Sequence, residues 1–301
     1  MEPVQSKAIR KTIYCFLMFF ALRLIEELLF VPRLGSTKSF IACLGGLIIL
    51  LIFIRFDNKS LDDIGVLFSG SKIGKGLGFA AAMNAVVAIA VFSTEIFQFK
   101  SYPGYSRLVL YYESPDRSFS AGIKTFLAWM GLALLVALVH ALFYEIAFRG
   151  LMITLASRAL PFAAVNLLQA GLYTVWFLVP VLRILLFSAG TLSRRQIVTL
   201  FLFSIVYEFL TALKLGMLRK ASGAVWVCIF DHIAFSFIID VVHMQYTNEA
   251  GALLTDSNYY VRALAYQAIA LLISVIYYQS KMKKVMEKQQ TAAIESTAQQ
   301  L

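Results

Sequence analysis

The chain has 301 residues, of which 60% are hydrophobic and 15% are charged, and its mean hydropathy is +0.76. A soluble domain contains about 45–50% apolar and about 25% charged residues, so this composition excludes a soluble globular enzyme and a disordered chain and indicates a polytopic membrane protein. The net charge of +10 does not indicate nucleic-acid binding, because the basic residues lie between apolar runs instead of forming one basic face.

Apolar runs long enough to cross ~30 Å of hydrocarbon as helices define the predicted architecture. The first run is too long and too charged for a signal peptide. We predict an all-α fold, with one membrane domain of about eight transmembrane helices over 1–280 and a basic, then polar, cytoplasmic tail over 281–301. The predicted spans are 12–32, 40–56, 76–98, 124–150, 161–187, 197–217, 223–245 and 260–279.

Eight spans place both termini on the same side of the membrane. With the N-terminus inside, most lysines and arginines outside the spans fall on the inner side, so the positive-inside rule predicts cytoplasmic termini. The main exception is the loop over 100–120, whose basic residues lie among tyrosines typical of the membrane interface. We therefore expect an integral multi-pass protein of the plasma membrane, whose immediate partner is the lipid bilayer.

Ionisable residues at membrane depth are costly and are candidates for functional sites. Arg23 and Glu27 are four residues apart on one helix face, with Glu26 beside them, and we expect a structural ion pair there. The three cysteines lie inside apolar runs and are expected to be small packing residues. A further group, expected to make inter-helix hydrogen bonds worth ~0.6 kcal/mol each, comprises Asn166, Gln169, Glu208 and Lys214.

The run from His140 to Gly150 concentrates polar residues in the fourth predicted span. Glu145 and Arg149 can pair one turn apart, while His140 and Tyr144 share a neighbouring face. Two interpretations stay open: a self-neutralised pair that anchors the end of the helix, or one wall of an active site.

A similar group begins at Asp231 in the seventh predicted span. His232 and Ser236 share a helix face, and Asp240 and His243 lie one and two turns further along. A single histidine in a membrane helix is more often a hydrogen-bonded packing residue than a ligand, so this group alone does not define a site.

Together, these two groups resemble the CAAX protease and bacteriocin-processing (CPBP, also called Abi) family of intramembrane proteases. The motifs of that family are Glu-Glu-x-x-x-Arg, commonly followed by Gly, then Phe-x-x-x-His, and then His-x-x-x-Asn or Asp after a small-residue turn. The corresponding segments of this chain are 144–150, 166–177 and 221–236, preceded by a similar lead-in at 61–65. The resemblance covers about 60–245. It implies a bundle of roughly eight helices whose motifs meet inside the membrane, and a bacterial source.

Glu145, Arg149 and His232 keep positions of these motifs. Tyr144, Phe177 and Ser236 stand in place of the first Glu, the His of the second motif and the Asn of the third. Peptide hydrolysis at such a site needs a water deprotonated by a carboxylate and held by imidazoles, with zinc or another divalent metal as a possible cofactor. A phenol is a poor base at neutral pH, and phenylalanine offers no ligand.

Zinc usually takes three protein ligands, and only one imidazole is left at the motif positions. A weaker alternative set of ligands comprises His140, Glu208 and His232. The sequence identifies no other cofactor, so the cofactor stays unknown, and zinc or another divalent metal is expected only if the chain is a protease.

Three functional hypotheses follow, and whether the chain is an enzyme stays open among them. The leading hypothesis is a catalytically inactive or strongly impaired CPBP-like protein that binds a membrane enzyme or a peptide as a scaffold. The second is an active CAAX-protease-like endopeptidase that uses a site rearranged around His140, Glu145, Glu208 and His232. The third is a small-molecule transporter.

Overall fold

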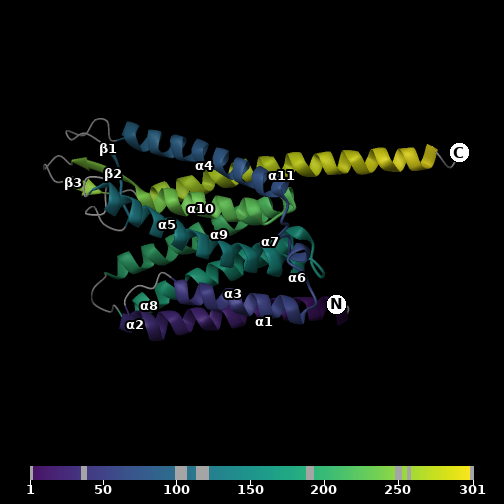
Figure 1. Ribbon diagram of the computed structural model, residues 1–301, viewed down its shortest axis with the longest axis horizontal. Helices are drawn as coiled ribbons and strands as arrows, with labels where there is room; N and C mark the ends of the chain where they lie inside the picture. The colour runs from purple at the N-terminus through teal and green to yellow at the C-terminus, as the bar shows by residue number, and fades with distance from the viewer. Residues whose placement is uncertain are drawn as a thin grey trace.

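The computed structural model describes residues 3–34, 39–98, 107–112, 122–187, 193–247, 253–255 and 259–298. Within these ranges the chain forms long helices that run back and forth between two ends of the molecule, with a small sheet at one end (Figure 1). Both termini lie at the opposite end, as expected when the chain crosses the bundle an even number of times.

The first part of the chain forms three long helices and several short elements. Among the short elements, Glu26–Phe30 (η1) is a π-helix and Asp62–Ile64 (η2) is a 3-10 helix. In chain order, they are α1 (Pro3–Ile25), η1 (Glu26–Phe30), α2 (Val31–Leu34), α3 (Phe40–Phe56), η2 (Asp62–Ile64), α4 (Gly70–Gln98) and β1 (Arg107–Leu110).

The second part contains the elements that carry the predicted motifs. Its π-helix, η5, continues α5 directly and passes into α6. In chain order, the elements are α5 (Ile123–Tyr144), η5 (Glu145–Met152), α6 (Ile153–Ala156), α7 (Phe162–Phe177), α8 (Val179–Phe187), α9 (Arg194–Ser222), α10 (Trp226–Val241), β2 (Val242–Thr247), β3 (Leu253–Thr255) and α11 (Tyr259–Ala298).

Five helical segments of the described chain are long and apolar enough to cross a membrane, which fits a multi-pass membrane protein. The predicted count of eight spans is therefore not confirmed. The other three predicted runs are also helical, but α3 has 17 residues and α10 has 16, and α1 carries several charges. The five segments are Gly70–Gln98, Ile123–Ala156, Phe162–Phe187, Arg194–Ser222 and Tyr259–Ser296.

Apolar side chains cover the outside of the bundle, and several charged side chains lie inside it. Ile48 and Ile89 are more than 60% exposed, whereas Arg149 and Lys214 are completely buried. This distribution is expected of helices whose surroundings are lipid, because the hydrocarbon accepts apolar side chains and charges must find partners in the interior. The three cysteines are buried free thiols, which confirms their expected role in packing.

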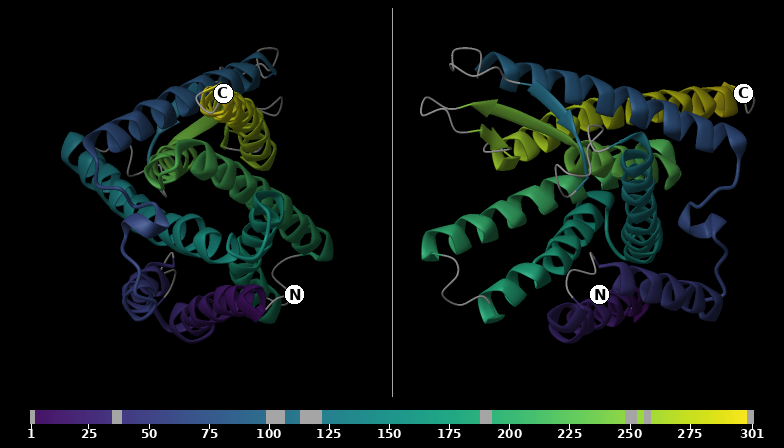
Figure 2. Two further views of the ribbon diagram at one scale, coloured as in Figure 1. Left: turned by 90° about the vertical axis from the view of Figure 1, so that its right-hand side faces the viewer. Right: turned by 60° about the vertical axis from the view of Figure 1, so that its left-hand side comes forward.

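The helices are arranged so that the motif-bearing elements lie in the middle. The ribbon views place α4 and α11 on one side of the bundle and α1 and α3 on the other, with α5, α7, α9 and α10 between them (Figures 1 and 2). The largest apolar cluster joins α1, α3, α5 and α7 through large rings such as Phe19, Phe143 and Trp176. The polar groups described below lie beside this cluster.

The chain is overwhelmingly helical, which agrees with the predicted all-α fold, and a small three-stranded antiparallel sheet is added at one end. β2 lies between β1 and β3, with Val109 opposite His243 and Tyr246 opposite Leu254. The span predicted over 223–245 is wrong at its end, because α10 stops at Val241 and the chain continues as β2. An apolar run alone does not distinguish a helix from a buried strand. The residues from Val242 onward form a strand because they pair with β1. The loop predicted over 100–120 accordingly contains β1, and most of its other residues lie outside the described ranges.

The tail predicted over 281–301 continues α11 as helix through Ala298. This part of α11 is exposed and projects beyond the ends of the other helices (Figure 1).

Candidate functional site

The first motif begins at Tyr144, the last residue of α5, and continues along the π-helix η5 in the middle of the bundle. All of its residues except Ile146 are buried. Short π-helical segments within longer helices are frequent at functional sites, because the wider turn changes which side chains face a neighbouring helix. The sequence contains no signal that marks this change of helix type.

Glu145 and Arg149 form the ion pair that their spacing predicts. The distance from Arg149 Nε to Glu145 Oε2 is 3.3 Å, and Nη1 donates to Oε1 at 3.4 Å. Across the helix interface, Nδ1 of His232 lies 2.8 Å from the same Oε1. The structure therefore brings the three kept motif residues together, with the carboxylate of Glu145 held from two sides by Arg149 and His232.

Aromatic rings occupy the space next to this group. The ring centroids of Tyr144 and Phe177, which stand at two replaced motif positions, are 5.1 Å apart in an edge-to-face contact. Tyr144 also lies 5.5 Å from the His232 ring, and Tyr173 lies 4.7 Å from Phe177. The replaced positions are thus neighbours in space, and they carry packed rings instead of a carboxylate and an imidazole.

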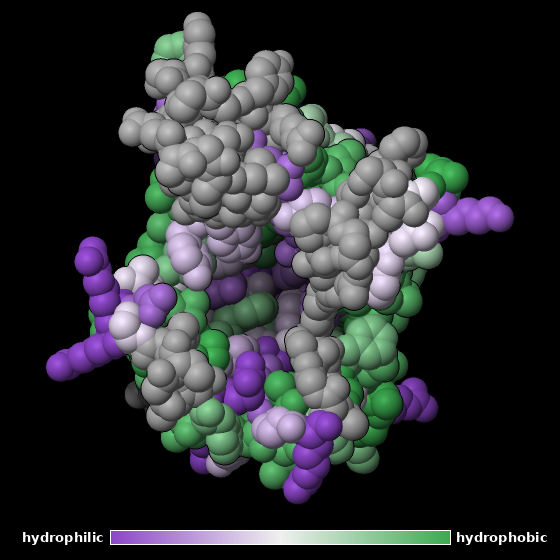
Figure 3. Space-filling model, turned by 90° about the vertical axis from the view of Figure 1, so that its left-hand side faces the viewer, coloured by the Kyte–Doolittle hydropathy of each residue, from purple (hydrophilic) through white to green (hydrophobic). Residues whose placement is uncertain are grey.

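A cavity of about 150 Å³ opens beside the Glu145–His232 pair. Figure 3 views the end of the molecule that carries the sheet and shows a hollow there with hydrophilic residues in its depth. The cavity is lined by residues of α5, α7, α9 and α10 together with Ser39, which precedes α3: Ser39, His140, Tyr144, Tyr173, Phe177, Tyr207, Glu208, Thr211, Lys214, Leu215, Asp231, His232, Phe235 and Ser236.

The alternative metal ligands His140, Glu208 and His232 all line this cavity. However, the described residues contain no group of three or more His, Cys, Asp or Glu side chains that could hold a metal ion. The predicted ligand set therefore shares a cavity without forming a metal site. Glu208 makes no hydrogen bond or ion pair with any residue that the structure describes, so its carboxyl group is available to the cavity.

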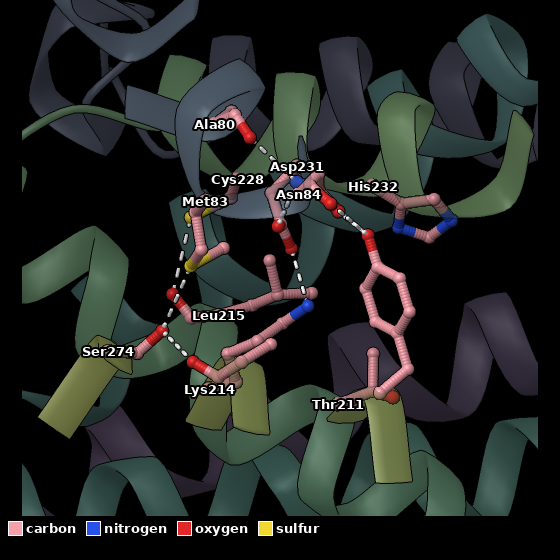
Figure 4. Close-up of polar contacts among 12 residues, drawn as sticks. Ala80, Met83, Asn84, Thr211, Lys214, Leu215, Cys228, Asp231, His232 and Ser274 are labelled. Carbon is pink, nitrogen blue, oxygen red and sulfur yellow. Dashed lines mark hydrogen bonds and ion pairs between the residues drawn. The ribbon is translucent and has the colours of Figure 1, made fainter. Parts of the chain in front are cut away.

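A buried polar network adjoins the cavity (Figure 4). Lys214 Nζ lies 2.6 Å from Asp231 Oδ2, and the side-chain amide of Asn84 donates to Asp231 Oδ1 at 2.8 Å. The hydroxyl of Tyr266 donates to Asn84 Oδ1 at 2.8 Å. Charges this deeply buried require such partners. Asn84 and Tyr266 were missed by the sequence analysis, since nothing in a single sequence shows that α4 and α11 lie against α10 at this depth.

The polar residues of the fifth and sixth predicted spans divide into two sets. As predicted, Asn166 and Gln169 bridge helices, donating to the carbonyl oxygens of Leu213 at 3.2 Å and Ala212 at 2.8 Å. Lys214, which was expected to join these bonds, instead pairs with Asp231 on α10. Glu208, expected in the same set, faces the cavity.

The group that follows His232 is only partly as predicted. Ser236 lines the same cavity as His232, in agreement with their shared face. His243 does not continue that face, because it belongs to β2, where its ring stacks on Tyr111 with the centroids 3.8 Å apart. Asp240 is exposed near the end of α10.

The charged group at the end of α1 is structural, as expected. Arg23 lies 3.0 Å from Glu27, which also pairs with Arg183 at 2.8 Å. The carboxylate of Glu26 accepts from the backbone N–H groups of Ile41 and Ala42 at the start of α3, at 3.1 and 3.0 Å. This carboxylate satisfies N–H groups that the first turn of a helix leaves without partners.

The lead-in at 61–65 packs against the end of the motif helix. A Cβ on Gly150 would lie 3.2 Å from the carbonyl oxygen of Ile64, so glycine allows this close approach. Gly65 has a positive φ of 86° and accepts a hydrogen bond from Val225 N at 2.9 Å. Outside the membrane-spanning helices, hydrogen bonds from the backbone N–H and hydroxyl of Ser60 hold the pKa of Asp63 below its ordinary value.

Comparison of the sequence with protein-family models finds no match, and comparison with curated proteins finds no similar sequence. The CPBP resemblance therefore rests on the motif residues themselves.

Proposed function

We propose that this chain is a CPBP-like integral membrane protein that binds a ligand in its central cavity without hydrolysing it. The observation that carries the proposal is the packing of Tyr144 against Phe177 where the resemblance calls for a carboxylate and an imidazole. The carboxylate of Glu145 is engaged by Arg149 and His232, so it does not act as a free base toward a water. A peptide bond in the cavity would therefore stay intact.

The charges around the cavity indicate what kind of ligand it takes. Arg149 pairs with Glu145 and Lys214 pairs with Asp231, whereas the carboxyl group of Glu208 forms no ion pair with any described residue. Aromatic rings surround the same space, and two of them already lie near buried cations: Arg149, behind the lining, is 4.2 Å from the Tyr173 centroid, and Lys214 is 5.4 Å from that of Phe235. A carboxylate among such rings favours a ligand with an ammonium or guanidinium group.

The ligand is a peptide segment or a membrane-linked molecule that presents this basic group. A volume of about 150 Å³ admits one group about the size of benzene, so the cavity takes a single side chain or headgroup. We place the protein in a bacterial plasma membrane with both termini in the cytoplasm. Its partner is then a membrane enzyme or peptide held at this site as on a scaffold.

Purification from the native source in mild detergent tests the proposal by identifying what remains bound. Ser236→Phe fills the cavity, whereas Val206→Phe adds the same ring on the outer surface of α9, where Val206 is 48% exposed. We expect a stoichiometric partner with the wild type and Val206→Phe that is lost from Ser236→Phe. Equal recovery from all three proteins would contradict binding in the cavity. Truncated peptides that disappear in His232→Ala would contradict the absence of hydrolysis.

One observation favours a second candidate, an endopeptidase with a rearranged site. His140, Glu208 and His232 line the same cavity, so a carboxyl group and two imidazoles face one space. This candidate predicts that Glu208→Gln and His232→Ala each abolish processing of a membrane peptide while the bundle stays folded. Full processing by both variants would eliminate it.

A further inference from the structure

A second cavity, of about 180 Å³, lies at the end of the bundle that holds the termini. The first turns of α4, the turn between α9 and α10, and the part of α11 near Lys281 surround it. The lining residues are Lys72, Lys75, Gly76, Phe79, Ala221, Ser222, Ala224, Val227, Tyr277 and Lys281. This cavity is separate from the central site and belongs to the surface of the bundle.

The charge of this cavity is strongly positive. Three of its lining residues, Lys72, Lys75 and Lys281, are lysines, and none of the described residues that line it is acidic. Lys72 Nζ donates to the carbonyl oxygen of Ser222 at 3.5 Å, which holds this ammonium group at the rim. Lys281 Nζ lies 5.4 Å from the centroid of the Tyr277 ring. Three ammonium groups from two helices converging on one space favour an anionic ligand.

The floor of the cavity is apolar. The rings of Phe79 and Tyr277 lie 4.3 Å apart, and Val227 lies beside them. Gly76 allows α4 to approach the start of α10, because a Cβ at this position would lie 3.0 Å from Val227 N. A soluble phosphate ion has no apolar group that could contact these rings. A phospholipid has both an anionic headgroup and apolar chains.

We propose that this cavity binds the headgroup phosphate of an anionic phospholipid. Its position fits, since basic pockets between transmembrane helices at the membrane surface bind anionic headgroups in this way. The lysines at the rim contact the phosphate, and the rings of the floor contact the first carbons of the lipid. This assignment does not depend on the function of the central cavity.

The chain contains its own matched control for general electrostatic attraction. Lys283, Lys284 and Lys288 lie further along the exposed part of α11, and none of them lines the cavity. Changing either set of three lysines to glutamine removes the same charge from the same end of the molecule. Only the set of Lys72, Lys75 and Lys281 removes ammonium groups from the cavity.

The experiment compares lipid binding by native mass spectrometry of the full chain in detergent, with phosphatidylglycerol and phosphatidylcholine as probes. We expect the wild type to retain phosphatidylglycerol preferentially. The variant Lys72→Gln/Lys75→Gln/Lys281→Gln should bind it at least about tenfold more weakly, and Lys283→Gln/Lys284→Gln/Lys288→Gln within about twofold of the wild type. Unchanged thermal unfolding of both variants shows that they are folded.

Three results would overturn the assignment. Equal losses in the two triple variants would mean that the lysines attract lipid only through their total charge. Equal retention of phosphatidylcholine would mean that the headgroup charge is not recognised. Displacement of the bound lipid by millimolar inorganic phosphate would identify a soluble anion as the ligand.

Discussion

The ion pair between Lys214 and Asp231 allows a quantitative test of the buried polar network. Both side chains are about 1% exposed, and their charged atoms are 2.6 Å apart. In Lys214→Met, the length and the apolar stem of the side chain stay and the ammonium group is lost. Asp231 then keeps the hydrogen bond from Asn84 and has no cation beside it among the described residues. Removing one partner of a buried ion pair costs about 3–5 kcal/mol, so we expect this loss in the free energy of unfolding.

A second substitution shows how much of the loss comes from the unpaired charge of Asp231 and how much from other effects of the methionine. In Lys214→Met/Asp231→Asn, the side chain at position 231 is neutral and its carbonyl oxygen still accepts from Asn84. Because no unpaired charge remains in the interior, we expect the double variant to recover most of the loss and to lie within about 2 kcal/mol of the wild type. Recovery by a second mutation is expected only if the two side chains interact.

Reversible unfolding by SDS in mixed micelles measures these free energies directly. The control is Lys283→Met, because Lys283 is exposed on α11 and lies 4.0 Å from Glu287, and such surface pairs contribute about 0–1 kcal/mol. Two results would refute the reasoning: a loss below about 1 kcal/mol in Lys214→Met, or a double variant no more stable than the single one.

Three other predictions concern packing and the cavity. In the same SDS unfolding assay, Gly216→Ala should lower the free energy of unfolding by about 1–3 kcal/mol, because its Cβ would lie 1.7 Å from Asn166 Oδ1. As a control, Gly171→Ala has open space around the new Cβ and should be neutral or stabilising. Glu208→Gln should unfold at the same SDS concentration as the wild type or a higher one, since no bond is lost; a clear loss of stability would reveal a partner. The three buried cysteines should react with a maleimide only after unfolding, as followed by mass spectrometry.

Much of the helical framework could be predicted from the sequence, because long apolar runs need a helix in lipid. The same holds for pairs within one helix. Arg23 with Glu27 and Glu145 with Arg149 are four residues apart, and both pairs form. The resemblance to the CPBP motifs implied that Tyr144 and His232 belong to one site, and their rings lie 5.5 Å apart.

Contacts between helices and local departures from regular helix could not be predicted in this way. The partner of Asp231 is Lys214 and not a residue of its own helix, and Asn84 joins them from a helix 147 positions away. Which helices face each other depends on the packing of the whole bundle, and a single sequence contains no record of it. The change from α5 to the π-helix at Glu145 and the end of α10 at Val241 depend in the same way on neighbours.

The difference between the kept and the replaced motif positions has a physical explanation that needs no catalysis. Glu145 and Arg149 are completely buried and paired, so losing either one would strand the other charge in the interior at a cost of about 3–5 kcal/mol. His232 holds the same carboxylate at 2.8 Å. In contrast, an aromatic ring at Tyr144 or Phe177 and a hydroxyl at Ser236 leave no buried charge without a partner. Stability alone would therefore account for Glu145, Arg149 and His232, and their presence is not evidence for a protease.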